Sequence, residues 1–257
     1  MELSKPFLHL KSFLKKSFHS LGLELRASHV NAYQDQKMIL ERFQEVKVIF
    51  DLGANRGETI YKYHNLFPSA NIYGFEPFEH EFVNLQARYQ NINQISVYPL
   101  AVSNQTEVKS FFVNRDSVMN SLLPVTVGSR TYIHPHQTKN VECREVNTIA
   151  LDDFCNQEKI ARINILKMDI QGAELMALQG AANLLQKQAV DLIYTEVNFG
   201  KLYEGQGNFP QVCQFLEQYD YILYGLYDLK YGSNGTLGWG DAIFLSPQGE
   251  KSLLKAW

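Results

Sequence analysis

Short apolar runs alternate with amphipathic stretches along most of this chain. Runs rich in Val, Ile and aromatic residues predict strands at 46–52, 71–77, 95–102, 163–170, 190–197, 221–229 and 240–247. Helical spacing of apolar positions predicts helices at 31–43, 79–89, 173–185 and 209–218, and another that ends near 66. Strands separated by single helices are typical of βαβ crossovers. We therefore predict a doubly wound α/β fold, with helices on both faces of a mostly parallel sheet.

The two C-terminal strands, 221–229 and 240–247, depart from that alternation. The residues between them are too few for a crossover helix. Strands joined by a short connection pair antiparallel. We therefore predict that the sheet closes with an antiparallel hairpin at its C-terminal end.

A second irregular region follows a strand-like run at 108–114. Roughly forty residues separate that run from the strand at 163–170, and they include an alternating run at 141–146 and a short helical run at 151–155. Long insertions in compact domains are usually lids or binding loops. We predict a lid-like insertion at about 112–147.

The N-terminal segment 5–26 has the pattern of a basic amphipathic helix. Apolar residues recur at helical spacing between lysines, as in Phe13, Leu14 and Lys15. Such a helix either packs on the domain and caps its site, or makes weak contact with an anionic membrane surface. The pattern divides the chain into a helical extension at 1–45 and a main domain at 46–257.

Composition narrows the classes of protein that fit. A length of 257 residues suits one large α/β domain with appendages, and the net charge of −3 gives no reason to expect a nucleic acid partner. The three cysteines lie far apart without metal-ligand spacing, which is typical of free thiols in a reducing compartment. No apolar run approaches the roughly 18 residues that cross a bilayer. We expect a cytoplasmic protein.

The stretch "VIFDLGANRGETI" at 48–60 marks the candidate ligand site. It places Asp51, Gly53, Asn55 and Gly57 where the first sheet strand meets its helix. In open α/β sheets, ligands bind at the carboxyl ends of the strands, near the point where strand order reverses. The glycines allow a tight turn and close approach of a ligand, and the helix N-terminus offers unpaired N–H groups.

Two acidic residues narrow the kind of ligand. The motif is DxGANxG instead of the GxGxxG that holds a pyrophosphate, and a carboxylate at Asp51 suits a cationic amino acid better than a phosphate. S-adenosylmethionine carries such a group. Glu76, at the end of the next strand, can accept hydrogen bonds from both hydroxyls of a ribose. Both NAD and S-adenosylmethionine contain that ribose, so the residues alone leave both open.

Four segments carry a resemblance to a known family. "VIFDLGANRGET", "GFEP", "LKMDIQGAELMALQGA" and "YTEV" together resemble the FkbM family of S-adenosylmethionine-dependent methyltransferases, over about 46–245. The resemblance implies a Rossmann-like class I methyltransferase fold with a seven-stranded sheet. It also implies methyl transfer, typically to a hydroxyl of a small natural product, sugar or glycoconjugate.

The resemblance also suggests roles for individual residues. Asp51, Gly53, Asn55 and Gly57 match the family's cofactor loop, and Glu76 matches its ribose acid. We place the adenine beside Ala101, which follows the third strand. Gln171 stands where family members often have Glu, which argues against a general base at that position.

Carboxylates at the ends of two later strands are the candidate catalytic groups. Methyl transfer to a hydroxyl needs alignment of the acceptor and removal of a proton. Asp169 and Glu196 fall at those ends, so we predict that they form the acceptor site and act without a metal. As an alternative, Asp169, Glu196 and Asn198 hold a divalent cation such as Mg²⁺, since they partly resemble the ligands of metal-dependent catechol-type methyltransferases.

Two other functions fit part of the pattern. A similar sheet serves NAD-dependent oxidoreductases, and a module that binds the cofactor without catalysis would keep the same cofactor loop. The candidate bases at the acceptor side make the non-catalytic module less favoured, and the DxGANxG motif, which differs from GxGxxG, argues against the oxidoreductase.

Overall fold

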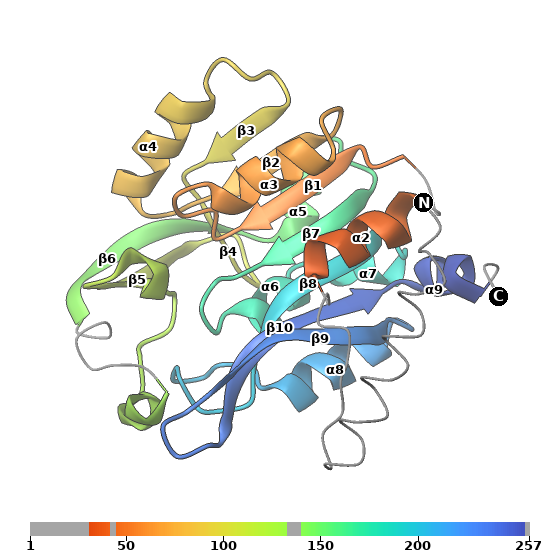
Figure 1. Cartoon of the computed structure of the whole chain (residues 1–257). Helices are drawn as coiled ribbons and strands as arrows, with labels where there is room; N and C mark the ends of the chain where they lie inside the picture. The colour runs from red at the N-terminus through yellow and green to blue at the C-terminus, as the bar shows by residue number, and fades with distance from the viewer. Residues whose placement is uncertain (1–30, 42–44, 133–139, 255–257) are drawn as a thin grey trace, which may run out of the picture.

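The computed structural model describes residues 31–41, 45–132 and 140–254. Its main sheet has seven strands in the order β3-β2-β1-β7-β8-β10-β9 (Figure 1). Their bounds are β1 Val48–Leu52, β2 Asn71–Phe75, β3 Ile95–Tyr98, β7 Ile163–Met168, β8 Val190–Asn198, β9 Ile222–Tyr231 and β10 Leu237–Leu245. The first five of the predicted strands pair in parallel, and β10 pairs antiparallel with both β8 and β9. The predicted sheet and its C-terminal hairpin are confirmed.

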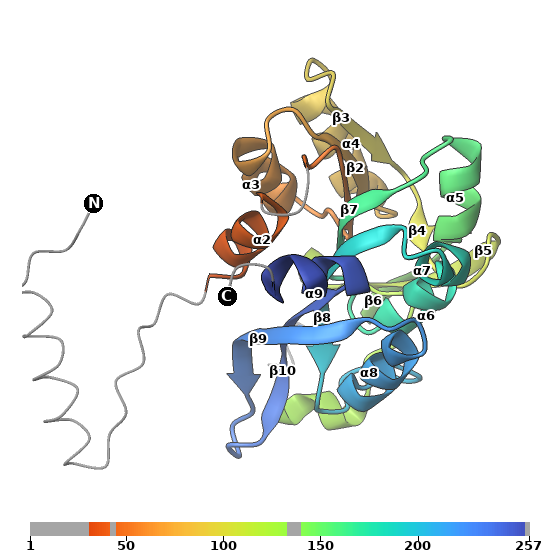
Figure 2. The ribbon, with the colours of Figure 1, turned by 90° about the vertical axis from the view of Figure 1, so that its right-hand side faces the viewer.

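Helices cover both faces of this sheet (Figures 1 and 2). One face carries α2 Ala32–Glu41, α3 Glu58–Leu66, α4 Glu79–Tyr89 and, against α2, α9 Pro247–Leu254. The other carries α5 Leu151–Gln157, α6 Glu174–Gln179, α7 Ala182–Gln186 and α8 Phe209–Glu217. Because helices cover each face, every residue of β7 and β8 is buried. Strand order reverses between β1 and β7, which places the expected ligand crevice there.

The predicted strand 95–102 is two strands in two sheets. β3 ends at Tyr98, and β4 Ala101–Val102 pairs in parallel with β6 Asn140–Ile149 in a small sheet that also contains β5 Val108–Asn114. Pro99 lies at the break; it lacks an N–H group and cannot continue the ladder. This small sheet was not predicted. It gives the insertion a rigid base.

The predicted helix 173–185 is also interrupted. α6 ends at Gln179 and α7 begins at Ala182. A side chain at Gly180 would collide with the backbone oxygen of Ser103, so the glycine allows the helical segment to lie directly on the loop after β4. Close packing of two backbones therefore ends α6, which the apolar periodicity alone does not reveal.

The described part of the N-terminal extension is α2, within the helix predicted at 31–43. Its Tyr33 packs edge-on against Tyr63 of α3 and Tyr194 of β8. The amphipathic helix predicted within 5–26 lies outside the described residues, so its membrane contact and the domain boundary stay predictions. Among the described helices, none is long and apolar enough to cross a membrane.

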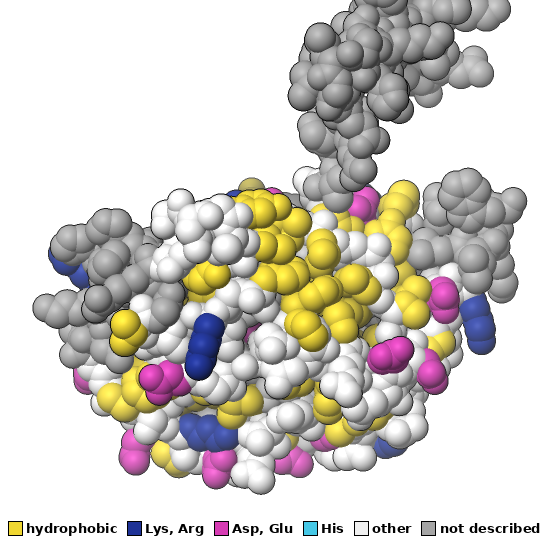
Figure 3. Space-filling model, turned by 90° about the horizontal axis from the view of Figure 1, so that it is seen from below, with side chains coloured by type: hydrophobic (Ala, Val, Ile, Leu, Met, Phe, Trp, Pro, Cys, Tyr) yellow, Lys and Arg dark blue, Asp and Glu magenta, His cyan; other side chains and the backbone are white. Residues whose placement is uncertain are grey.

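Figure 3 shows the face of the molecule that lies at the bottom of the view in Figure 1. Hydrophobic side chains gather there in one area, with single acidic and basic side chains scattered around it (Figure 3). This face is therefore mixed in character and does not form a basic patch.

Candidate active site

A cavity of about 640 Å³, its open mouth included, lies at the carboxyl ends of β1, β2 and β7. Five of the predicted site residues line it: Gly53, Asn55, Glu76, Ala101 and Asp169. Apolar side chains form much of the rest of its wall, namely those of Phe75, Leu100, Val102, Phe111, Leu122, Ile170 and Ala173. Within the described chain, four other predicted residues do not line it: Asp51, Gly57, Glu196 and Asn198.

The loop after β1 turns sharply at the cavity floor. Gly53 has a φ of 78°, and a side chain there would collide with the backbone oxygen of Asp169. Asn55 also has a positive φ, of 42°, and its amide Nδ2 lies 3.4 Å from Ser117 Oγ. Gly57, with a φ of 79°, precedes α3 and packs against Leu85 and Tyr89 of α4. Gly53 and Asn55 thus shape the cavity, whereas Gly57 fixes α3 to α4.

Glu76 is buried at the end of β2 and faces the cavity. Its Oε2 accepts a hydrogen bond of 2.8 Å from the Asn55 N–H, and its Oε1 accepts one of 2.8 Å from the Phe78 N–H. Burial raises the pKa of Glu76 to about 7, although the two N–H donors oppose that rise. Each carboxylate oxygen keeps a further lone pair that can accept a hydrogen bond from a hydroxyl.

Asp51 lies beneath the cavity, on the face of the sheet that α2 and α3 cover. Its Oδ1 is 3.6 Å from Lys167 Nζ, and the same ammonium is 3.5 Å from Asp169 Oδ2. Burial lowers the pKa of Lys167, but Asp169 and Asp51 raise it more, so the ammonium stays charged. Neither oxygen of Asp51 accepts a hydrogen bond from the described residues. Lys167 therefore joins the cofactor loop to the acceptor side.

Gln171 fixes the other oxygen of Asp169. Its Nε2 donates a hydrogen bond of 2.7 Å to Asp169 Oδ1, and its Oε1 accepts one of 2.6 Å from the Tyr203 hydroxyl. The backbone of Gln171 is left-handed, with a φ of 57°, and its carbonyl accepts a hydrogen bond from the Ser121 hydroxyl. Asp169, which is partly exposed at the cavity wall, is thus held from both sides.

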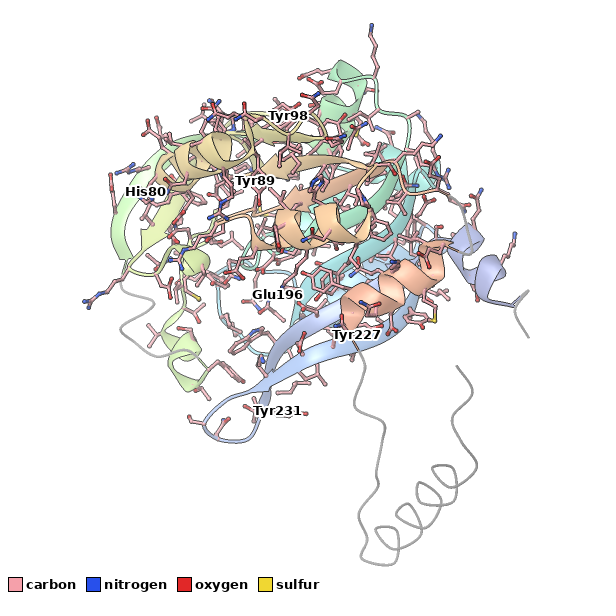
Figure 4. All side chains as sticks on the ribbon, turned by 45° about the horizontal axis from the view of Figure 1, so that its top comes forward. His80, Tyr89, Tyr98, Glu196, Tyr227 and Tyr231 are labelled. Atoms are coloured by element: carbon pink, nitrogen blue, oxygen red, sulfur yellow. The ribbon has the colours of Figure 1, made fainter. Side chains whose placement is uncertain are left out.

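Glu196 lies at the carboxyl end of β8, near the centre of the molecule (Figure 4). Burial raises the pKa of this carboxyl well above its usual range, and the charges of Asp169, Glu174 and Asp241 raise it further. Asp241 stands opposite Glu196 on β10 and accepts a hydrogen bond of 2.6 Å from the Tyr194 hydroxyl. Burial raises the pKa of Asp241 to about 6. Carboxyl groups with raised pKa values are suited to take up protons near neutral pH.

The donor set for a metal ion is incomplete in the described part of the chain. It contains no group of three or more His, Cys, Asp or Glu side chains that could hold a metal ion. Lys167 Nζ lies 3.5 Å from Asp169 Oδ2 and occupies one side of that carboxylate. Action without a metal and the cation alternative both stay predictions.

Comparison with known proteins identifies the family. The model of the methyltransferase FkbM domain matches residues 51–223. This chain belongs to the FkbM methyltransferase family. It is therefore an enzyme that transfers methyl groups, and its methyl donor is S-adenosylmethionine, which sets aside the oxidoreductase and the non-catalytic alternatives.

Two curated relatives and one solved structure show how far the FkbM likeness extends. The chain is 23% identical over 205 residues to the 2-O-methyltransferase NoeI of Sinorhizobium fredii, covering 78% of this chain and 83% of NoeI. It is 26% identical over 168 residues to the hexuronic acid methyltransferase AglP of Haloferax volcanii, covering 64% of this chain and 61% of AglP. The crystal structure of an FkbM methyltransferase from Methylobacillus flagellatus KT shares the fold, with a TM-score of 0.50 and 16% identity over 78% of this chain and 44% of that one.

The cavity of this FkbM chain fits S-adenosylmethionine. Its apolar wall around Ala101 suits an adenine, and the Glu76 carboxylate suits a ribose diol. Asp51 does not line the cavity, and its carboxylate already lies 3.6 Å from the Lys167 ammonium. The residues that line the cavity therefore match the adenine and the ribose of the cofactor.

Sequence reasoning missed several residues of this FkbM site. Ser117, Asn120 and Leu122 of the insertion line the cavity, and Asp241 approaches from the C-terminal hairpin. No local motif marks them. Only Asp241 could have been found from the sequence. If the last two strands form the predicted antiparallel hairpin, an acid in the last strand lies near the end of β8.

Proposed function

We propose that this protein is an O-methyltransferase that methylates a hydroxyl of a sugar or glycoconjugate. The printed names of NoeI and AglP support a sugar acceptor and, for NoeI, transfer to oxygen. The chain spans about three fifths of the length of AglP and less than half of the length of the solved FkbM chain. The two names also differ in the acceptor that they imply.

The observation that carries the proposal is the pair of carboxylates beyond the cofactor cavity. Asp169 follows β7, and Glu196 lies near the carboxyl end of the neighbouring strand β8, the side of the crevice where an acceptor would meet the donor. Asp169 is held by Lys167 and Gln171, so it is placed to orient the acceptor. Burial and the neighbouring carboxylates raise the pKa of Glu196, which suits this carboxyl group to take up a proton.

The residues divide the chemistry as follows. S-adenosylmethionine, when bound, supplies the electrophilic methyl group. Gly53, Asn55, Glu76 and Ala101 line its cavity, and we assign Asp51 to its ammonium. Glu196 would take the proton of the acceptor hydroxyl while its oxygen bonds to the methyl carbon and the bond from that carbon to sulfur breaks, which gives a methyl ether and S-adenosylhomocysteine.

The insertion completes the cavity in this proposal. Its described part brings Ser117, Val118, Asn120 and Leu122 to the cavity wall. The Ser117 hydroxyl donates a hydrogen bond of 3.0 Å to Glu81 of α4. We assign this segment the role of excluding water from the reacting groups.

Two measurements test the proposed function. Isothermal titration with S-adenosylhomocysteine and with NAD should show binding of the first only. Transfer of a labelled methyl group to hydroxylated glycosides should then depend on Glu196. Binding of NAD alone would reject the proposal.

A further inference from the structure

The acceptor side of the site carries an excess of negative charge. Asp169, Glu196 and Asp241 come from the neighbouring strands β7, β8 and β10 near the same edge of the sheet. They lie close enough to act on one another, since Asp169 and Asp241 both raise the pKa of Glu196. Asp169 also raises the pKa of Asp241.

The Lys167 ammonium interacts with each carboxyl group on this face of the sheet. Lys167 Nζ lies between Asp51 Oδ1 at 3.6 Å and Asp169 Oδ2 at 3.5 Å. The same ammonium also lowers the pKa of Glu196 and of Asp241. The Lys62 ammonium also acts on Asp51, so among the described residues four carboxyl groups share two ammonium groups, and the acids outnumber the bases on this face. The Tyr194 hydroxyl adds a donor to Asp241 but no charge.

Asn198 is an independent sign that a polar ligand belongs here. It is 1% exposed, and neither its Oδ1 nor its Nδ2 has a hydrogen-bond partner among the described residues. Alternation along β8 puts Asn198 on the same face of the sheet as Glu196. A buried amide without partners is costly, so it calls for a group that both donates and accepts, as a hydroxyl does.

We propose that the acceptor is a hydroxylated ring that is uncharged or carries an amine, and that this site rejects a ring carrying a carboxylate. The inference rests on the proposed function, because it places the reacting hydroxyl beside Glu196. Hydroxyl and ammonium donors satisfy the lone pairs of Asp169, Glu196 and Asp241. A carboxylate among them would face like charges and leave the Asn198 Oδ1 without a donor.

Three probes that share one ring test the charge preference: glucosamine, glucose and glucuronic acid. Each is titrated into the S-adenosylhomocysteine complex at pH 7.5 and constant ionic strength, with the melting temperature as the readout. We expect glucosamine to bind at least about tenfold more tightly than glucuronate, with glucose between them. Equal shifts, or a larger shift with glucuronate, would overturn the inference.

Two variants serve as matched controls. Asp241→Asn keeps an oxygen that can accept the hydrogen bond from the Tyr194 hydroxyl and removes one negative charge. It should therefore reduce the difference in affinity between glucosamine and glucuronate. The double variant Asp241→Asn, Glu196→Gln should abolish the difference in affinity between glucosamine and glucuronate. An unchanged difference in that double variant would mean that other residues determine it, and would overturn the inference. Failure of the proposed function appears separately, as absence of S-adenosylhomocysteine binding; the same titrations are then run on the free protein and decide the charge preference alone.

Discussion

The side-chain amide of Gln171 lies 2.7 Å from Asp169 Oδ1 and donates a hydrogen bond to it. The other end of the same amide accepts from the Tyr203 hydroxyl at 2.6 Å. Because an amide has distinct donor and acceptor ends, these two bonds fix its orientation. Tyr203, Gln171, Asp169 and Lys167 thus form one connected chain that ends at Asp51.

Gln171→Glu tests this chain. The substitution replaces a donor to Asp169 with a like charge, so Asp169 loses its fixed position. We expect kcat to fall about tenfold or more. Tyr203→Phe is the milder control, since it removes only the bond to Oε1 of Gln171 and should cost less. Steady-state kinetics of both variants give the two falls in kcat. A greater fall in kcat for Tyr203→Phe than for Gln171→Glu would contradict the prediction.

Glu196→Gln should separate activity from stability. The variant cannot accept the proton, so we expect turnover to fall about a hundredfold or more. Burial raises the folded-state pKa of Glu196 above its unfolded value, so the ionised carboxylate destabilises the fold. That destabilisation is fully present above the folded pKa and disappears below the unfolded pKa. The variant should therefore melt higher than the wild type at pH 8.5 and not at pH 4.

Those melting curves have a clear contrary result. A Glu196→Gln variant that melts lower than the wild type at pH 8.5 would mean that the carboxylate makes a stabilising contact when ionised. The assignment of Glu196 as the base would then lose its physical support.

Glu76 predicts the pH dependence of cofactor binding. Its pKa is raised to about 7 by burial, and only the ionised form accepts hydrogen bonds with both oxygens. At pH values below that pKa, Glu76 is protonated and must lose its proton before the ligand can bind. The affinity for S-adenosylhomocysteine should therefore rise about tenfold between pH 6 and pH 8. Calorimetry of Glu76→Gln is the control, and its affinity should be weaker and independent of pH across that range.

Much of the fold could be predicted because it follows from local patterns. α4 begins and ends at the predicted residues, Glu79 and Tyr89, because its apolar residues follow helical spacing, with acids in the first turn and Arg88 in the last. The break at Gly180 depends on contact with a distant segment, the backbone of Ser103. The small sheet likewise pairs β4 with β6, which lies some way along the chain. Periodicity carries no information on such pairings.

The candidate site divides in the same way. Gly53, Asn55, Glu76 and Ala101 were predictable because they follow the strands β1, β2 and β3 that form the crevice. The ion pairs of Lys167 and the position of Asp241 depend on which strands are neighbours. Sequence indicated only that a lysine in an apolar strand needs an acidic partner, and the register of β1 against β7 supplies Asp51.

Asp51→Ala should abolish cofactor binding, because it removes the carboxylate assigned to the ammonium of the donor. Glu196→Ala should leave binding intact and depress turnover. Loss of Asp51 also leaves Lys167 with Asp169 as its remaining ion-pair partner among the described residues, and breaking a buried pair commonly costs about 3–5 kcal/mol. Asp51→Asn, which preserves shape, therefore accompanies the Ala variant. Equal affinity of the Asp51 and Glu196 variants for S-adenosylhomocysteine in calorimetry would contradict both assignments.

Gly180→Ala tests whether packing or helix propensity decides the break between α6 and α7. Propensity alone favours alanine by about 1 kcal/mol in a helix. The added carbon would, however, collide with the backbone oxygen of Ser103, so we expect a net loss of about 2 kcal/mol or more in the free energy of unfolding. Gly249→Ala in α9 is the matched control, since its new side chain would meet Leu245 at an ordinary 3.4 Å and should stabilise slightly. Urea unfolding of both variants gives the comparison. A gain in stability for Gly180→Ala would show that the loop after β4 can move away, and that α6 ends for another reason.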